Sequence, residues 1–368
     1  MRNFVPFTGF APDSSQANPE LWVDCSGVIP GPLGFEAAPT PATGGLPALA
    51  AACTGAALIK KADNTFKLFL GTATHLYDGS SGTAYTDVSR TVGGAYTGTA
   101  DNPWRFAIFQ NDAILATNRS DALQVITSGA DFENCTGSPP KAACIETVGG
   151  FVILANTDNF TDEVYNSAYL DHTSWAVSRA TQANKYRLVD NTSSGSIRGL
   201  KKFADKCVAY KDTSMWLGVY VGSPVVWDWK PLPGDVGCSS QEAVVEVFIQ
   251  GAPAHIFFCA ELADFYIFGG VRPFSIGAPV RKWFTERIDP AYKYLVKALH
   301  DRQNERVTFY YPARGGSTIN KAVTYYYGQK YGVAGAWGIP VEVAIEATVQ
   351  VVTGAITYDT IGTALGSP

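Results

Sequence analysis

The sequence predicts a mainly β protein, with a single β-propeller-like domain of about six or seven blades and an irregular N-terminal arm. From residue 55 onward, pairs of short apolar runs recur around polar or glycine turns near residues 63, 111, 149, 205, 262 and 304. Short β-formers around such turns are typical of hairpins. The turns lie 38 to 57 residues apart, which leaves room for about four strands in each repeat, as in a propeller blade.

The first 54 residues are predicted to form an extended, Pro/Gly-rich arm and assembly segment. From Gly27 to Pro47, ten residues are Gly or Pro, a density that neither a helix nor a central strand accommodates. Apolar side chains nevertheless occur along this arm. We assign Phe4, Phe7, Phe10 and Trp22 as candidate assembly contacts.

Residues 55–330 are predicted to form the propeller-like domain. The hairpins pair residues 58–61 with 66–70, 106–109 with 113–116, 144–148 with 151–154, 200–203 with 207–210, and 255–259 with 265–268, and a weaker one ends in 307–311. A two-sheet sandwich would use only seven to nine strands, whereas this chain has room for many more. Residues 331–368 are expected to supply C-terminal strands that close the propeller or contact neighbouring molecules.

One segment near residue 295 is compatible with either a helix or a strand. Tyr292, Leu295 and Leu299 have helical spacing after Asp289 and Pro290, and proline is favourable in a first helical turn. A strand is favoured almost as strongly, because apolar residues also alternate along the segment, at Tyr292, Tyr294, Val296 and Ala298.

Composition excludes several classes of protein. Charged residues make up 17% of the chain and apolar residues 46%, and the net charge is −5. These values exclude a disordered chain and a coiled coil, and the acidity disfavours a dedicated nucleic-acid binder. Few charges together with 12% aromatic residues favour a protein that buries surface in an assembly.

Targeting and redox signals are weak. The N-terminus lacks a basic head followed by an apolar run, so we expect no secretory signal. The most apolar stretch, residues 46–59, is too short and too interrupted to span a membrane. The seven cysteines show no CxxC spacing, and we expect reduced thiols that act as small core residues.

No catalytic or metal motif stands out, so we expect no enzyme, cofactor or metal. The four histidines (His75, His172, His255 and His300) are dispersed without HxH or HxxxH spacing, and no GxSxG elbow occurs. Asn156, Asp158 and Asp162 faintly resemble a calcium loop but lack its central Gly and terminal Glu. A glycosidase would need facing carboxylates, for which Asp24, Asp78, Asp205 and Glu261 are the candidates.

Residues 281–306 are locally basic. Arg281, Lys282, Arg287, Lys293 and Lys297 are interleaved with aromatic residues. These five are candidate assembly or lumen contacts. A solvated or subunit-facing pair of strands explains them better than a DNA-facing patch, because a channel that must release DNA should make few phosphate contacts.

An ordered set of segments resembles a family of bacteriophage structural proteins. The family comprises the β-propeller tail-tube or nozzle proteins of short-tailed phages, also described as packaged-DNA stabilisation proteins. The resemblance covers roughly residues 25–330. It rests on residues 27–47, 70–72 with 75–78, 104–109, 116–118 with Asp121 and Gln124, 165–167 with Trp175, 236–240, and 264–270 with 276–277.

This resemblance implies a virion structural protein, a ring-forming part of the head–tail connector and tail conduit. Copies would form a ring, most simply a hexamer, below the portal and adaptor, retain packaged DNA, and contact it transiently at ejection. The protein would be located in the virion tail, and in the host cytoplasm during assembly, without a membrane span. Two alternatives remain open: a carbohydrate-binding or glycan-cleaving propeller, and a cellular scaffold propeller.

Overall fold

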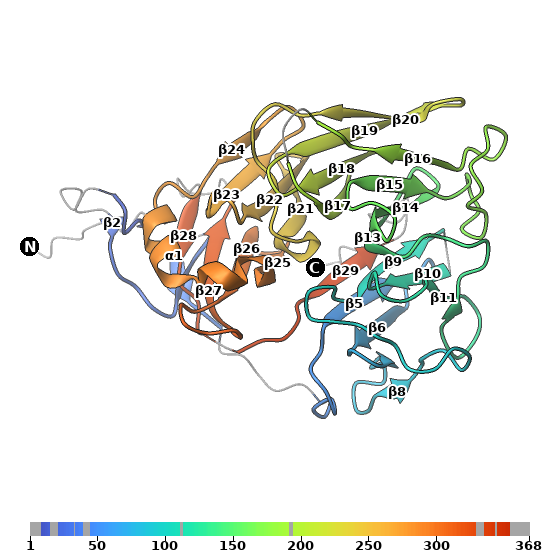
Figure 1. Ribbon diagram of the computed structural model, residues 1–368. Helices are drawn as coiled ribbons and strands as arrows, with labels where there is room; N and C mark the ends of the chain where they lie inside the picture. Colours follow the sequence, from blue (N-terminus) through green and yellow to red (C-terminus); the bar gives the residue numbers. More distant parts are fainter. Residues whose placement is uncertain are drawn as a thin grey trace, which may run out of the picture.

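A computed structural model describes residues 9–14, 21–32, 34–39, 45–110, 113–190, 194–328, 335–342 and 344–353, the last four of these by their backbone alone. Within them, six antiparallel sheets of four consecutive strands radiate around a central axis (Figure 1). The predicted propeller fold is therefore confirmed, with six blades. No described helix is long and apolar enough to cross a membrane.

Each blade is formed by one continuous stretch of chain, with its first strand innermost. Blade 1 contains β5 (Gly55–Lys60), β6 (Phe66–Gly71), β7 (Leu76–Asp78) and β8 (Thr86–Asp87); blade 2 contains β9 (Arg105–Phe109), β10 (Ala113–Thr117), β11 (Gln124–Ile126) and β12 (Glu133–Asn134); blade 3 contains β13 (Ala142–Val148), β14 (Phe151–Thr157), β15 (Glu163–Asn166) and β16 (Asn184–Arg187). Blade 4 contains β17 (Ile197–Phe203), β18 (Lys206–Lys211), β19 (Met215–Gly222) and β20 (Val226–Pro231); blade 5 contains β21 (Val244–Ile249), β22 (Ala252–Cys259), β23 (Asp264–Phe268) and β24 (Pro273–Ser275); blade 6 contains β25 (Lys297–Asp301), β26 (Arg306–Pro312), β27 (Ile319–Tyr326) and β28 (Ala336–Gly338).

The inner strands have continuous apolar sequences because both of their faces are covered by neighbouring blades. Every residue of β9, β10 and β14 is buried, whereas the outermost strand β16 alternates between half-buried and exposed positions. Between β13 and β14, Gly149 and Gly150 adopt positive φ angles of +58° and +83°. This is the two-residue turn expected of a tight hairpin.

The predicted hairpin that turns near residue 262 is confirmed as β22 and β23. The first hairpin of blade 5, which joins β21 to β22 and turns at Gln250 and Gly251, was not predicted. Asn111 and Asp112, the predicted turn of blade 2, lie outside the described residues. The ambiguous segment contains both proposed structures, because a 3-10 helix (η2, Pro290–Leu295) leads directly into β25.

Apolar clusters join neighbouring blades, with one exception. Five clusters join blades 1 to 2, 2 to 3, 3 to 4, 4 to 5 and 5 to 6. Among the described residues, no such cluster joins blade 6 to blade 1. This seam is therefore held differently from the other five blade interfaces.

A C-terminal strand lies at the seam. β29 (Val349–Thr353) pairs in parallel with β5 along the inner edge of blade 1, so that Val351 is opposite Leu58. It also contacts the inner strands β9 and β25, and Figure 1 shows it crossing the centre of the ring. The axis is consequently occupied by chain, and β29 links blade 1 to blade 6.

We expect Val351→Pro to weaken the seam. Proline cannot donate a ladder hydrogen bond and is poorly tolerated inside a paired strand, so the expected loss of stability is about 1–3 kcal/mol. Hydrogen exchange should accelerate at those β5 amides that face β29 and remain slow in β13 and β14. Unchanged β5 protection would show that β29 does not hold this edge.

The N-terminal arm packs on the outer side of blade 6. β1 (Gly9–Phe10) pairs with β2 (Leu21–Trp22), β3 (Val28–Gly31) pairs with β4 (Gly34–Ala37), and both β1 and β3 contact β28. The ring of Phe10 lies edge-on to Trp283 with a centroid separation of 5.1 Å. Trp283 belongs to helix α1 (Arg281–Arg287), which the sequence analysis did not predict.

Candidate functional site

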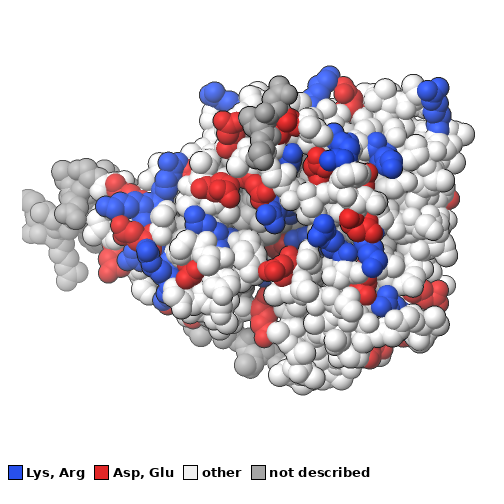
Figure 2. All heavy atoms as spheres, in the orientation of Figure 1, with Lys and Arg blue, Asp and Glu red and all other residues white. Residues whose placement is uncertain are grey.

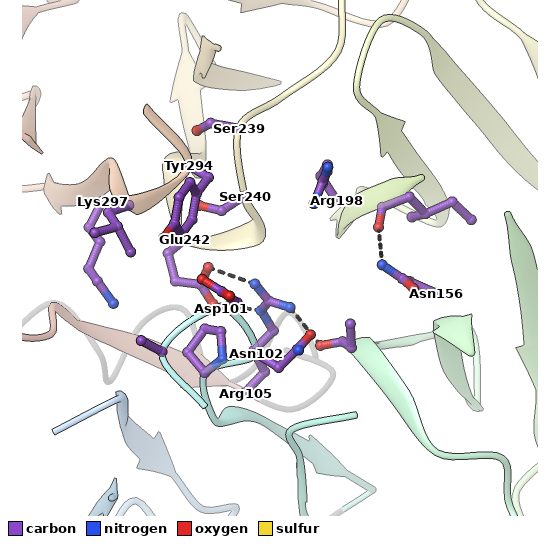
Figure 3. Close-up of a pocket in the computed structure, with 15 residues that line it drawn as sticks. Asp101, Asn102, Arg105, Asn156, Arg198, Ser239, Ser240, Glu242, Tyr294 and Lys297 are labelled. Carbon is purple, nitrogen blue, oxygen red and sulfur yellow. Dashed lines mark hydrogen bonds and ion pairs between the residues drawn. The ribbon is translucent and has the colours of Figure 1, made fainter. Parts of the chain in front are cut away.

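A small cavity with a largely polar lining lies on the axis of the propeller, where the inner strands begin. It has a volume of about 60 Å³ and adjoins a wider cavity of about 310 Å³; the two share Arg198, Ser239 and Tyr294. Figure 3 shows the charged side chains Arg105, Glu242 and Lys297 around the smaller cavity. On the face seen in Figure 2, charges of both signs gather over the middle of the molecule, and the right-hand side is mainly uncharged.

An ion pair spans the axis between buried Arg105 and partly buried Glu242, whose side chains are 9% and 19% exposed. The Arg105 guanidinium, at the start of β9, donates from Nε to Glu242 Oε1 at 2.6 Å and from its terminal nitrogen to Oε2 at 2.9 Å. The other terminal nitrogen of Arg105 donates to the Ala143 carbonyl at 2.7 Å. Burial alone would raise the pKa of Glu242, but the adjacent guanidinium outweighs burial and holds that pKa at about 2. Glu242 is therefore a carboxylate at neutral pH.

The short helix η1 (Gln241–Ala243), which carries Glu242, connects several blades. Gln241 donates its side-chain amide to the Ile145 carbonyl of blade 3 at 2.8 Å. The Ser240 hydroxyl donates to the Val296 carbonyl, just before blade 6, at 3.2 Å. With Arg105 of blade 2, these bonds tie the chain that enters blade 5 to three other blades. Polar side chains thus close the axis at this end.

Three further polar groups border the same cavity. Lys297 is 7% exposed, and within the described part of the chain no hydrogen bond or ion pair reaches its ammonium group. Burial lowers the pKa of Lys297, and nearby Glu242 opposes that effect. The Ser239 hydroxyl and the Asn156 side-chain oxygen are buried and lack a partner among the same residues.

The structure separates the residues that the basic segment suggested. Lys297 borders the smaller cavity and Lys293 the wider one. Arg281, Lys282 and Arg287 belong instead to α1, outside the axis and beside the N-terminal arm.

The candidate contact residues of the N-terminal arm differ in how exposed their side chains are. Phe10 is buried at 1% exposure, whereas Trp22 is 41% exposed. Phe4 and Phe7 lie outside the described residues.

Arg105 and Glu242 were missed as site residues. The only sequence signal was a charged residue at the start of an otherwise apolar strand, in the segment Trp104-Arg105-Phe106. Its partner lies 137 residues away, and no local pattern identifies it.

The carboxylates considered for glycan cleavage do not share one cleft. Asp78 pairs with Lys67 at 2.8 Å within blade 1, whereas Asp205 lies at the turn between β17 and β18. Glu261 borders the wider axial cavity, and Asp24 lies in the arm, between β2 and β3. The structure gives these four residues no common catalytic geometry.

Two of the residues that faintly resemble a calcium loop are instead engaged with other residues of this chain. Asn156 donates to the Ile197 carbonyl at 2.9 Å, and Asp162 pairs with Arg187 at 2.6 Å. Over the described ranges, no group of three His, Cys, Asp or Glu side chains is arranged to hold a metal ion. All seven cysteines are free thiols.

Buried His255 has a structural role. Its Nε2 donates to the Lys202 carbonyl at 2.8 Å, and its Nδ1 lies 2.7 Å from the Tyr210 hydroxyl, from which a neutral ring accepts. Burial lowers the pKa of His255 to about 4, although the Lys202 hydrogen bond opposes the shift.

We expect acid to destabilise the fold through this group. Because the pKa of His255 falls from 6.5 to about 4 on folding, the unfolded chain binds the proton first as pH drops below 6.5. By pH 5, His255 alone should lower the free energy of unfolding by about 2 kcal/mol. Urea unfolding at several pH values measures this loss. His255→Gln should make the free energy of unfolding depend less steeply on pH between 6.5 and 5. The remaining pH dependence should include the contribution of His300, whose pKa is also lowered by burial to about 4. An unchanged slope would contradict this assignment.

Comparison with known proteins identifies the fold but no family. No protein-family model matches the chain, and no curated protein matches it. A streptogramin B lyase structure is similar over 83% of this chain and 89% of its own, at 12% identity and a TM-score of 0.50. A quinoprotein alcohol dehydrogenase-like protein from Bacteroides thetaiotaomicron is similar over 81% of this chain and 68% of its own, at 12% identity and a TM-score of 0.48. Likeness at this identity concerns the fold alone.

Proposed function

We propose that this protein is a virion structural component, a ring-forming subunit of the tail conduit of a short-tailed bacteriophage. The observation that carries the proposal is the ordered set of segments, over roughly residues 25–330, that resembles phage tail-nozzle propellers. In that role the protein contributes rigid geometry rather than catalysis.

The segments that carry the resemblance contribute to the internal scaffold of the blades. They include buried polar residues such as Asn118, Gln124 and Asp264. Asn118 donates to Asp121 at 2.9 Å, and Gln124 donates to Asn134 at 2.8 Å. The first bond lies in the loop between β10 and β11, and the second joins the paired strands β11 and β12. They support a role in which a propeller must keep its shape under load.

The filled axis of the propeller restricts where DNA could pass in such a conduit. β29 crosses the centre of the propeller, and Arg105 and Glu242 close one end. DNA would therefore pass between subunits, through the centre of a ring of several propellers. Six copies at −5 each carry −30, which favours a lumen that repels DNA.

The same ring requires subunit interfaces. The N-terminal arm on blade 6 and the mainly uncharged side seen at the right of Figure 2 are candidates for them. Interfaces are depleted in charged residues at their centre, and this chain has an unusually low charged fraction of 17%.

The decisive experiment is peptide mass spectrometry on purified, DNA-filled particles of the phage that encodes the chain. Copy number is measured against the major capsid protein. About six copies per particle are expected for a hexameric ring of the resembling family. Absence from particles, with soluble monomer in the lysate, would overturn the proposal and favour an enzyme or a cellular scaffold.

A further inference from the structure

Blades 3 and 4 share an exposed apolar surface. It is formed by residues 167–183, between β15 and β16, and by the hairpin of β19 and β20. Its apolar side chains are each 42% to 53% exposed: Tyr169, Leu170, Tyr220, Val221 and Val225. Single exposed apolar residues are common, but a contiguous group of them marks an interaction site. We call this group the blade 3–4 surface.

The two segments form one continuous surface because they share a buried support. The ring centroid of Phe151, which is fully buried in β14, lies 5.4 Å from that of Tyr169 and 5.6 Å from that of Tyr220. The Tyr220 hydroxyl also donates to Gln182 Oε1 at 2.8 Å, which ties the hairpin to the other segment. The surface is therefore fixed before a partner binds, and binding requires little ordering of its side chains.

Few charges interrupt the blade 3–4 surface. The turn between β19 and β20 contains no charged residue, and the charged side chains of residues 167–183 are Asp171 and Arg179. Asp171 accepts hydrogen bonds within its own turn. Arg179 lies next to the hairpin, where its carbonyl accepts from the Ser223 hydroxyl at 3.1 Å. An apolar centre with charge at its edge is the usual composition of a protein–protein interface.

The N-terminal arm carries a second exposed apolar group. Trp22 and Val23 are 41% and 46% exposed. Their position is fixed, because Trp22 lies opposite Phe10 in the pairing of β2 with β1, and Phe10 packs against Trp283 of α1. Asp24, which follows them, is an exposed carboxylate. Tryptophan is one of the residues that contribute most to binding at interfaces, so the arm has the composition of a docking element.

The arm and the blade 3–4 surface lie on opposite sides of one subunit. The apolar clusters join the blades in chain order, so blade 6, which carries the arm, is opposite blade 3 in the six-bladed ring. Figure 1 accordingly shows β2 at the left and β16, with the β19–β20 hairpin, at the right. Two different surfaces on opposite sides of a molecule suit head-to-tail contacts between copies, which form a ring where the rotation closes.

We infer that the blade 3–4 surface binds the N-terminal arm of a second copy of this chain. Trp22 and Val23 are the apolar side chains that the contact buries. Asp24 on the arm and Arg179 on the blade 3–4 surface have opposite charges, so the facing edges do not repel each other. Each copy uses its arm toward one neighbour and its blade 3–4 surface toward the other. The inference names the interface of the proposed ring and rests on that part of the proposed function.

Photo-crosslinking from the arm tests the contact directly. A full-length chain with Trp22→p-benzoylphenylalanine is mixed in dilute solution with isotopically heavy chain of natural sequence, then concentrated and irradiated. Mass spectrometry should find light–heavy crosslinks to peptides from residues 167–183 or 219–226. Crosslinks to another surface, crosslinks within one chain alone, or no crosslinks would overturn the inference.

Charge substitutions separate the two sides of the contact. Val23→Glu on the arm and Val221→Glu on the blade 3–4 surface should each weaken self-association about ten-fold or more in sedimentation velocity. An equal mixture of the two variants should form a dimer and no larger species, because one intact arm and one intact surface remain. A mixture that stays monomeric, or natural chain that does not self-associate, contradicts a head-to-tail contact.

Two further variants control this experiment. Val92→Glu changes a residue that is 80% exposed between β8 and β9, away from both surfaces, and should assemble like the natural chain. Val225→Glu replaces Val221→Glu if that variant fails to fold, and the same loss of association is expected. Equal losses from Val92→Glu and the interface variants would show a general effect of charge and overturn the assignment.

Failure of this contact is distinguishable from failure of the proposed function. Particles that contain about six copies, but whose arms crosslink elsewhere, would retain the tail conduit and reject this interface. A head-to-tail crosslink in a chain that is absent from particles would retain the interface and reject the role in the tail.

Discussion

Replacing Glu242 by Gln is expected to destabilise the protein by about 3–5 kcal/mol at neutral pH, the range found when one partner of a buried ion pair is removed. The substitution leaves Arg105 and Lys297 buried without a carboxylate. The shift of the Glu242 pKa from 4.5 to about 2 gives a similar figure, about 3 kcal/mol. Urea unfolding at pH 7 measures the loss.

The pH dependence gives a second check on the same group. A carboxylate whose pKa is lowered by folding contributes its stabilisation above pH 4.5 and loses it as pH falls toward 2. The stability difference between wild type and Glu242→Gln should therefore narrow below pH 4.5.

Two further variants serve as controls. Glu261→Gln changes an exposed carboxylate and should alter stability by less than about 0.5 kcal/mol. The double variant Arg105→Met/Glu242→Met, which removes both charges, should recover much of the loss. A Glu242→Gln protein as stable as wild type would show that the axial pair does not hold the blades together.

Phe265→Ala should cost about 3–5 kcal/mol, as expected for loss of a fully buried aromatic ring. Phe265, on β23, is 0% exposed and lies where blade 5, blade 6 and α1 meet. Its ring centroid is 4.8 Å from those of Phe284, Phe309 and Trp337, and 5.3 Å from that of Phe258. Truncation leaves a cavity that these four rings, held on four different elements, cannot close without moving those elements.

The neighbouring strand provides a matched control. Phe274, on β24, is 52% exposed and stacks on Arg272 with a cation-to-centroid distance of 4.7 Å. Phe274→Ala should therefore cost less than about 1 kcal/mol. Equal losses from the two alanine substitutions in chemical denaturation would contradict the assignment of Phe265 to the centre of this core.

Local pattern was sufficient to predict the blades. A run such as Trp104 to Phe109 contains strand-forming residues bounded by turn formers, and the structure forms β9 there, from Arg105 to Phe109. The four-strand repeat followed from counting turns. The number of blades needed three dimensions, because turns spaced unevenly, 38 to 57 residues apart, are compatible with six or seven blades.

What the sequence analysis missed depends on contacts between distant residues. Helix α1 has only seven residues, too few for a helical period to stand out. Its first turn is capped from the arm, where the Asp13 carboxylate accepts from the Trp283 amide at 3.0 Å across 270 residues. The basic segment suggested one surface, but the chain passes from α1 at the edge to Lys297 at the axis within ten residues.

The parallel pairing of β29 with β5 determines the order in which a newly synthesised chain can complete its ring. β5 leaves the ribosome early, and its axial partner follows 293 residues later, from Ala56 to Val349. Closing a flexible loop of that length costs about 5 kcal/mol by the logarithmic rule. If blades 2 to 6 have already folded, they bring the two ends together and remove most of that cost. The seam between blade 6 and blade 1 is therefore the last to form during synthesis, and until residue 353 has emerged the nascent propeller keeps an open inner edge along β5.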